Sequence, residues 1–279
     1  MSEEELPPAW SEHFLPNVIR RLHPSAPLAH ITPDIAWGGS TGRGVRVAVV
    51  DTGIEADHPV FSGNVSGGVI IELDEEAEDG YVAIPDNPPR DVAGHGTACA
   101  GIIHRIAPEA ELFSVRVLGD NMRGRAVTFA AGLDWAINNG FQVINMSLST
   151  SSENYQKLFY ELADDAYFKN VVLVAAVNNI PAPSYPSTFS AVVSVAAHHE
   201  RDPWTYYYNP TPPVEFGAAG IDIEVAWINK QYAVNTGNSF AAPHITGLVA
   251  LILSKHPGLT PFQVKTMLMA GARNLRKEE

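Results

Sequence analysis

The sequence contains very little cysteine: Cys99 is the only one among 279 residues. A single cysteine rules out a disulfide within the chain, so the fold must depend on a buried core. Charged residues are also scarce, at 18% of the chain, whereas hydrophobic residues make up 46%. This balance is typical of a compact globular protein and not of a disordered one.

Positive charge is the second shortage. The chain has 18 Lys and Arg residues against 31 Asp and Glu residues, which gives a formal net charge of −13. Nucleic acids and anionic membranes are themselves negatively charged, so an acidic protein is a poor partner for either. We therefore expect a protein that binds neither nucleic acid nor membranes.

Long apolar runs are absent as well. The most apolar run, residues 248–253, is far too short to cross a bilayer. The chain starts with Glu3, Glu4 and Glu5 soon after Met1, and it has no basic start followed by an apolar stretch, as a signal peptide would. We expect a cytoplasmic location, with the alternative that the chain was cut from a longer precursor.

Short apolar runs alternate with helical patterns over most of the chain. The runs cover residues 45–50, 111–118, 141–148, 171–177 and 191–197. Because apolar residues occur on both faces of these runs, both faces of each predicted strand should be buried, as in a parallel sheet covered by helices. Helical patterns occupy residues 125–138, 154–168 and 239–255, and Thr260-Pro261 begins a last helix.

This alternation predicts an α/β fold, namely a doubly wound, mostly parallel sheet with helices on both faces. Residues 1–30, rich in proline, histidine and acidic residues, are interpreted as a short N-terminal extension that lies on the surface. Residues 31–279 are interpreted as a single domain. In such sheets, ligands bind at the carboxyl ends of the strands.

Three polar residues stand at positions suited to catalysis. Asp51 directly follows the apolar run 45–50, so it lies at the carboxyl end of a predicted strand. His95 is flanked by glycines, which allow a substrate to approach the imidazole closely. Ser239 begins a predicted helix, near unpaired N–H groups and the positive end of the helix dipole. Taken singly, they are equally consistent with a turn aspartate, a loop histidine and an N-cap serine.

Taken together, they stand in three segments that resemble the signatures of the subtilisin-like serine peptidases. The segments read VAVVDTGIEADHP, GHGTACAGII and TGNSFAAPHITGLVALI, in the family's order of Asp, His and Ser. The similarity extends over about residues 31–270. The resemblance implies a serine endopeptidase in which Ser239 is the nucleophile, His95 is the general base and Asp51 orients that base.

The resemblance also implies how the substrate is bound. Asn178, after the run 171–177, is identified as the oxyanion-hole asparagine, which acts with the backbone N–H of the nucleophile. A polypeptide or precursor-peptide substrate would pair as an added strand beside Ser147 and Leu148. Segment 119–124, which ends at Gly124, would be the strand that faces it.

The pocket for the residue before the scissile bond is expected to be narrow. Ser149 and Thr150 stand where the family usually has a pair of glycines. Val177 stands where a glycine usually precedes the oxyanion asparagine. The added side chains predict a preference for small or unbranched residues over Phe and Tyr.

No metal or cofactor is expected. In many members of the family, a loop inserted into the helix after the catalytic histidine binds calcium together with an aspartate. Here residues 101–108 run directly toward the next strand, and Val60 occupies the aspartate position, so the oxygen ligands are missing. His198-His199 has no partner at metal-ligand spacing and is expected on the surface.

Two other classes of function are weighed against an active peptidase. A catalytically inactive, subtilisin-like module would bind peptides without cleaving them, and labelling of Ser239 by an organophosphorus reagent would separate the two. A general α/β hydrolase acting on esters is disfavoured, because the chain lacks Gly-x-Ser-x-Gly and has the order Asp, His, Ser.

Overall fold

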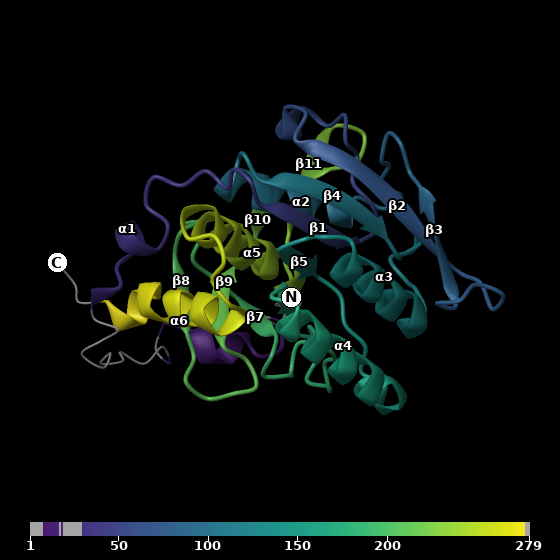
Figure 1. The fold of residues 1–279 in the computed structure, drawn as a ribbon. Helices are drawn as coiled ribbons and strands as arrows, with labels where there is room; N and C mark the ends of the chain where they lie inside the picture. Colours follow the sequence, from purple (N-terminus) through teal and green to yellow (C-terminus); the bar gives the residue numbers. More distant parts are fainter. Residues whose placement is uncertain (1–7, 17, 19–29, 277–279) are drawn as a thin grey trace, which may run out of the picture.

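The computed structural model describes residues 8–16, 18 and 30–276, and in these residues nine strands form one sheet. Their order across the sheet is β3-β2-β4-β1-β5-β6-β7-β9-β8 (Figure 1). The strands are β1 (Arg46–Asp51), β2 (Val65–Leu73), β3 (Tyr81–Pro85), β4 (Glu111–Arg116), β5 (Val143–Met146), β6 (Val172–Ala176), β7 (Val193–His198), β8 (Tyr206–Tyr208) and β9 (Phe216–Ala219).

The strands from β2 to β9 in this order are all parallel, whereas the outermost strands β3 and β8 are antiparallel to their neighbours. The five apolar runs of the sequence correspond to the adjacent strands β4, β1, β5, β6 and β7. The prediction of a mostly parallel sheet is therefore confirmed. A separate antiparallel hairpin, β10 (Ile223–Trp227) and β11 (Gln231–Asn235), lies outside the sheet.

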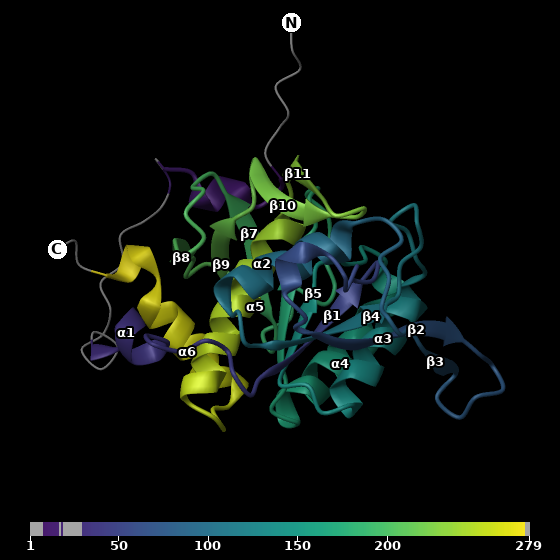
Figure 2. The same cartoon turned by 90° about the horizontal axis from the view of Figure 1, so that it is seen from above.

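Helices cover both faces of the sheet (Figures 1 and 2). Val47 and Val49 of β1 join a core cluster with α2 (His95–Ile106), α5 (Asn238–Lys255) and α6 (Pro261–Gly271). Ala48 and Val50 point the other way, toward α3 (Ala126–Asn138) and α4 (Gln156–Phe168). Alternate residues of a strand face opposite sides, so this burial of both sets confirms the doubly wound α/β class.

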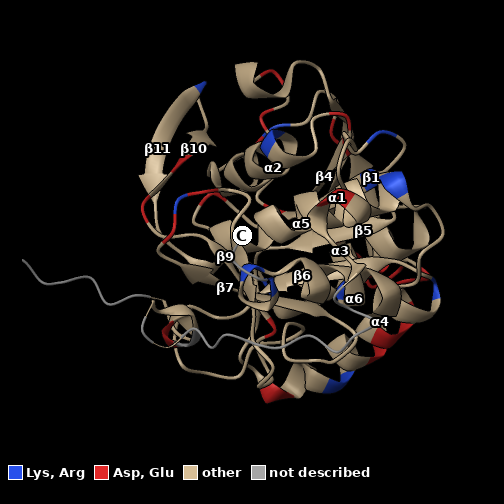
Figure 3. Ribbon diagram, turned by 90° about the vertical axis from the view of Figure 1, so that its left-hand side faces the viewer, with Lys and Arg blue, Asp and Glu red and all other residues tan. Residues whose placement is uncertain are grey.

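The core helix α5 and the helix α4 differ in charge. The α5 ribbon is almost free of charged residues, whereas α4 carries acidic and basic positions (Figure 3). This contrast fits the position of α5 in the core, where unpaired charge is costly. Among the described residues, no helix is both long enough and apolar enough to cross a membrane.

The described part of the N-terminal extension packs into the domain. Residues Ser11–Phe14 form a short 3-10 helix, η1, and only 2% of Phe14 is exposed. Its ring lies in a small core cluster with Val177 and Tyr207. The expected surface position is therefore wrong for Phe14. Residues 1–7, 17 and 19–29 of the extension lie outside the described residues. After the extension, the first helix is α1 (Pro33–Ala36).

Candidate active site

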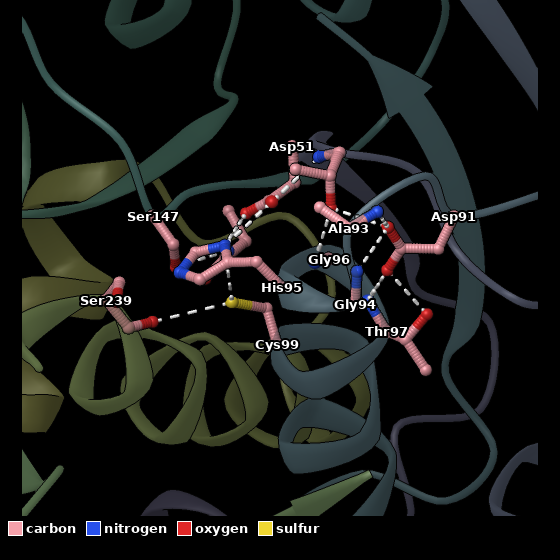
Figure 4. A network of polar contacts seen from close by, with 12 residues as sticks. Asp51, Asp91, Ala93, Gly94, His95, Gly96, Thr97, Cys99, Ser147 and Ser239 are labelled. Atoms are coloured by element: carbon pink, nitrogen blue, oxygen red, sulfur yellow. Dashed lines mark hydrogen bonds and ion pairs between the residues drawn. The ribbon is translucent and has the colours of Figure 1, made fainter. Parts of the chain in front are cut away.

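Asp51 and His95 form a buried pair at the carboxyl end of β1 (Figure 4). Asp51 is the last residue of β1, which lies between β4 and β5 in the sheet, and His95 is the first residue of α2. Nδ1 of His95 lies 2.7 Å and 2.9 Å from the two carboxylate oxygens of Asp51. Donation from Nδ1 to the carboxylate leaves Nε2 as the proton acceptor of the neutral ring.

The pKa of His95 is raised well above its usual value of 6.5. Burial by itself disfavours the imidazolium, but the negative charge of Asp51 and its hydrogen bond outweigh burial. An imidazole held in this way is a stronger base than a free one. The pair can therefore accept a proton from a nearby hydroxyl and stabilise the cation that results.

A second carboxylate, Asp91, holds the turn that leads into His95. Its oxygens accept hydrogen bonds from Thr52, Ala93, Gly94 and Thr97. The hydroxyl of Thr52 in turn accepts from the backbone N–H of Gly96. The N-cap of α2 is a glycine with no side chain to cap the helix, so Asp91 supplies acceptors for the unpaired N–H groups at its start.

Asp91 was missed by the sequence analysis. A signal was present, because an acidic residue stands four positions before the catalytic histidine and close to the start of its helix. Figure 4 shows Asp91 on the opposite side of this turn from Asp51. The two carboxylates have different tasks: Asp51 contacts the imidazole, and Asp91 fixes the backbone that presents it.

Ser239 faces His95 across a cavity of about 380 Å³ that both residues line. It is the second residue of α5, where backbone N–H groups have no partner within the helix. The ring of Phe240 packs against the imidazole, with 5.3 Å between the centroids. In the described residues, no hydrogen bond joins the Ser239 hydroxyl to His95. Such contacts are often long without substrate and tighten in the complex.

Cys99 lies beneath this pair, one turn along α2 from His95. Its Sγ is 3.9 Å from Nδ1 of His95 and donates to the carbonyl oxygen of Ser239 at 3.5 Å. Burial raises the pKa of the Cys99 thiol, so the group stays protonated near neutral pH. Cys99 therefore packs against the reacting residues without serving as a nucleophile.

The two adjacent asparagines after β6 point in different directions. Oδ1 of Asn178 accepts from the backbone N–H of Ile180, as in a local turn. Oδ1 of Asn179 instead accepts from the N–H of Asn238, directly before Ser239, at 2.8 Å. A Cβ placed on Gly237 would lie 3.2 Å from Oγ of Ser239 and 3.5 Å from Nδ2 of Asn179.

Gly237 therefore leaves open space between the Ser239 hydroxyl and the amide of Asn179. An oxyanion donor must point its N–H at the place where negative charge develops next to the nucleophile. The geometry argues against the expectation for Asn178 and favours Asn179. The two assignments differ by one residue, and in an extended segment a shift of one residue reverses the direction of the side chain.

Most of the expected substrate-contacting residues line the cavity. These are Ser147, Leu148, Ser149 and Val177. Met122, from the expected facing segment 119–124, also lines the cavity, as does Leu118, for which no contact was expected. Gly124 is not among the lining residues, although Met122 from the same segment is. Thr150 is not among them either, and its backbone pairs with that of Tyr185. The segments expected to flank a substrate are therefore brought together.

The helix that begins at His95 is uninterrupted to Ile106, and β4 begins a few residues later, which agrees with the absence of an inserted loop. In the described part of the chain, one cluster has donor atoms close enough for a metal ion: Asp51, His95 and Cys99, within 4.8 Å of one another. It coincides with the catalytic pair.

His198 is buried, with Nε2 2.9 Å from the carbonyl oxygen of Thr205, so its expected surface position is wrong.

Curated proteins of known family are similar to this chain over most of its length. The minor extracellular protease Epr of Bacillus subtilis (strain 168) is 34% identical over 244 residues, which are 82% of this chain and 35% of Epr. The thermostable alkaline protease of Halalkalibacterium halodurans is 34% identical, over 81% of this chain and 62% of that protein. The chain thus spans about a third of the length of Epr and less than two thirds of the length of the alkaline protease.

Subtilisin BL of Lederbergia lenta is 32% identical over 249 residues, which are 85% of this chain and 86% of subtilisin BL. The crystal structure of a cold adapted subtilisin-like serine proteinase matches with a TM-score of 0.67 and 27% identity, over 83% of each chain. A family model described as the subtilase family matches residues 42–279. This match covers both members of the buried pair and Ser239, and the chain belongs to the subtilase family.

Proposed function

We propose that this protein is a serine endopeptidase that hydrolyses peptide bonds. The observation that supports this most strongly is the pair Asp51–His95 facing Ser239 across one cavity. Each of the three lies at the end of a central strand or the start of a core helix, so the fold fixes its position. The relatives named above are proteases by their descriptions, which supports the same activity here.

The reaction begins with proton transfer from Ser239. Nε2 of His95 takes the hydroxyl proton as Oγ attacks the carbonyl carbon of the scissile bond. Asp51 keeps the ring in the tautomer that allows this and stabilises the imidazolium. His95 then returns the proton to the leaving amine, and an acyl-enzyme on Ser239 remains.

The tetrahedral intermediates have negative charge on the former carbonyl oxygen. We assign its stabilisation to Nδ2 of Asn179 and the backbone N–H of Ser239. One such donor contributes about 3 kcal/mol to the transition state. Water then attacks the acyl-enzyme, with His95 acting again as base, and Ser239 is restored.

The substrate backbone is proposed to lie between Ser147-Leu148 and the segment that contains Met122, where it would add a strand. Ser149 and Asn178 line the pocket for the residue before the cut. With Asn179 as the oxyanion donor, Asn178 takes the place at which the family usually has glycine. Two added side chains on the wall favour small or unbranched residues over Phe and Tyr.

Digestion of a diverse peptide library by the full chain, with Ser239→Ala as the matched control, tests this function. We expect internal cleavage that the control lacks, mostly after small or unbranched residues. Ser149→Gly should extend the accepted set toward larger residues. Absence of cleavage by a folded wild-type protein would reject the endopeptidase, and a profile dominated by aromatic residues would reject the narrow pocket alone.

A further inference from the structure

Asn238, the residue before the nucleophile, joins several separate segments of the chain. It is fully buried. Its Oδ1 accepts from the N–H of Ala197 on β7 at 2.9 Å, and its own N–H donates to Oδ1 of Asn179 at 2.8 Å. A side-chain amide has two N–H donors and an acceptor oxygen, so Asn238 can form more hydrogen bonds than a single hydroxyl could. Asn238 therefore has the task of holding separate segments of the chain together.

That task involves the N-terminal extension. Nδ2 of Asn238 donates to the carbonyl oxygen of Ala9 at 3.0 Å, and it also lies within hydrogen-bond distance of the carbonyl oxygens of Val177 and Asn178. The N–H of Ala9 in turn donates to the carbonyl oxygen of Asn179 at 2.8 Å. Ala9, Asn179 and Asn238 thus form a closed ring of hydrogen bonds.

The extension is anchored a few residues beyond this ring. Between the ring and the anchor lies the helix η1, and at its end Phe14 packs with Val177, Ala196, Tyr207 and Val214. A Cβ on Gly217 of β9 would lie 2.5 Å from the Phe14 ring, so the glycine leaves the room that the ring occupies. Burial of the Phe14 side chain stabilises the docked segment in addition to the hydrogen bonds that Ala9 forms with Asn179 and Asn238.

The docked segment does not occupy the substrate site. None of residues 8–16 lines the cavity shared by His95 and Ser239. A segment that blocked the enzyme would have to lie in that cavity. This one instead forms hydrogen bonds with the backbone of Asn179 and the side chain of Asn238.

We propose that residues 8–14 are a positioning element of the active site, which acts through Asn238 on Asn179 and Ser239. The inference rests on the proposed endopeptidase activity. Docking of Phe14 holds Ala9 in the ring, and the ring fixes both the amide of Asn179 and the backbone that enters the nucleophile. Displacement of such groups by about 1 Å can lower a rate by about a hundredfold, so undocking should reduce kcat more than it changes KM.

Phe14→Ala in the full chain tests the anchor, because Phe14 does not line the cavity shared by His95 and Ser239. We expect kcat to fall by at least about tenfold, with KM within about twofold of wild type. Phe14→Leu should restore most of the rate, because it refills the pocket between β7 and β9. Val18→Ala is the matched control: this exposed residue follows the docked segment, and the change should leave both constants as they are.

Two further measurements show whether the effect passes through Asn238. In an Asn238→Ala background, Phe14→Ala should lower kcat little further, because the link is already broken. By NMR, amide hydrogen exchange at Asn238 should be faster in Phe14→Ala than in wild type or Val18→Ala. The exchange measurement does not depend on peptidase activity. The proposed function is tested separately, by cleavage that the wild-type protein performs and Ser239→Ala does not.

Three results would overturn the inference. The first is a melting temperature that falls in Phe14→Ala while kcat is unchanged, which would make the segment a structural element only. The second is a rise in activity on undocking, which would make it an inhibitor. The third is a loss of kcat that is fully additive with that of Asn238→Ala, which would place its action elsewhere.

Discussion

The sulfur of Cys99 lies 3.9 Å from Nδ1 of His95, one helical turn further along α2 and beneath the catalytic imidazole. A mercury ion on this thiolate would occupy the space next to the imidazole and displace it from Asp51. We expect Hg²⁺ to inactivate the enzyme in proportion to the Cys99 that is modified, slowly because the thiol is buried.

Peptidase activity assayed against the extent of Cys99 modification, measured by mass spectrometry, checks this expectation. Excess thiol should restore the activity, and a Cys99→Ala variant should be insensitive to Hg²⁺ whatever its own rate. Full activity in a sample with stoichiometric mercury on Cys99 would contradict this position of the thiol.

The raised pKa of His95 predicts a shifted pH profile. Only the neutral imidazole can accept the Ser239 proton, so the enzyme is inactive below this pKa and active above it. Because the pKa is raised, kcat/KM should increase with pH with a midpoint above 6.5, measured on a substrate with no titrating groups near that pH.

The variant Asp51→Asn tests whether Asp51 is the cause of the raised pKa of His95. It removes the charge that raises the pKa and leaves burial, so the residual activity should have a lower midpoint. The rate itself should fall by about 10⁴-fold, as expected when the imidazole loses its orienting carboxylate. A wild-type midpoint at or below 6.5 would show that Asp51 does not outweigh burial.

The two asparagines after β6 can be separated by paired substitutions. Asn179→Ala should lower kcat by about 10²- to 10³-fold with little change in KM, because an oxyanion donor acts mainly in the transition state. Asn178→Ala should have a much smaller effect on kcat, because Oδ1 of Asn178 only caps a local turn. The reverse ranking, measured by steady-state kinetics on one peptide substrate, would return the role to Asn178.

Calcium should have no effect on thermal stability. The helix that begins at His95 contains no inserted loop, and Val60 stands where the family resemblance would place a ligand aspartate. A ligand stabilises the folded state only where it has a site. We expect equal melting temperatures in millimolar calcium and in excess EDTA. A drop of several degrees on chelation would show a tight site elsewhere, for example in the acidic residues 72–79.

The central strands and the catalytic pair could be predicted because their local signals agree. The run that forms β1 is apolar on both faces, and Asp51 is the first polar residue after it, so strand, end and functional residue are all marked in the sequence. The edge strands gave weaker signals. β2 contains Gly67 and Gly68, and β9 is only four residues long, so neither has the continuous apolar pattern.

The remaining differences between expectation and structure have one physical origin: the sequence shows residue types, but not which way a side chain points or what covers it. Asn178 and Asn179 are chemically identical, and only the path of the chain after β6 separates them. His198 was expected on the surface, yet a backbone carbonyl satisfies its ring and allows burial. Phe14 lies in a segment of mixed composition, and its pocket is formed by strands about 200 residues further along the chain.

Covalent labelling of Ser239 tests the central claim most directly. The full chain would be incubated with a fluorophosphonate, and the modified residue located by mass spectrometry, with His95→Ala and Ser239→Ala as controls. We predict a single adduct on Ser239, formed in parallel with loss of peptidase activity, much slower in His95→Ala and absent in Ser239→Ala. A folded protein whose Ser239 remains unlabelled, or whose peptidase activity survives complete labelling of Ser239, would contradict the assignment of Ser239 as the nucleophile.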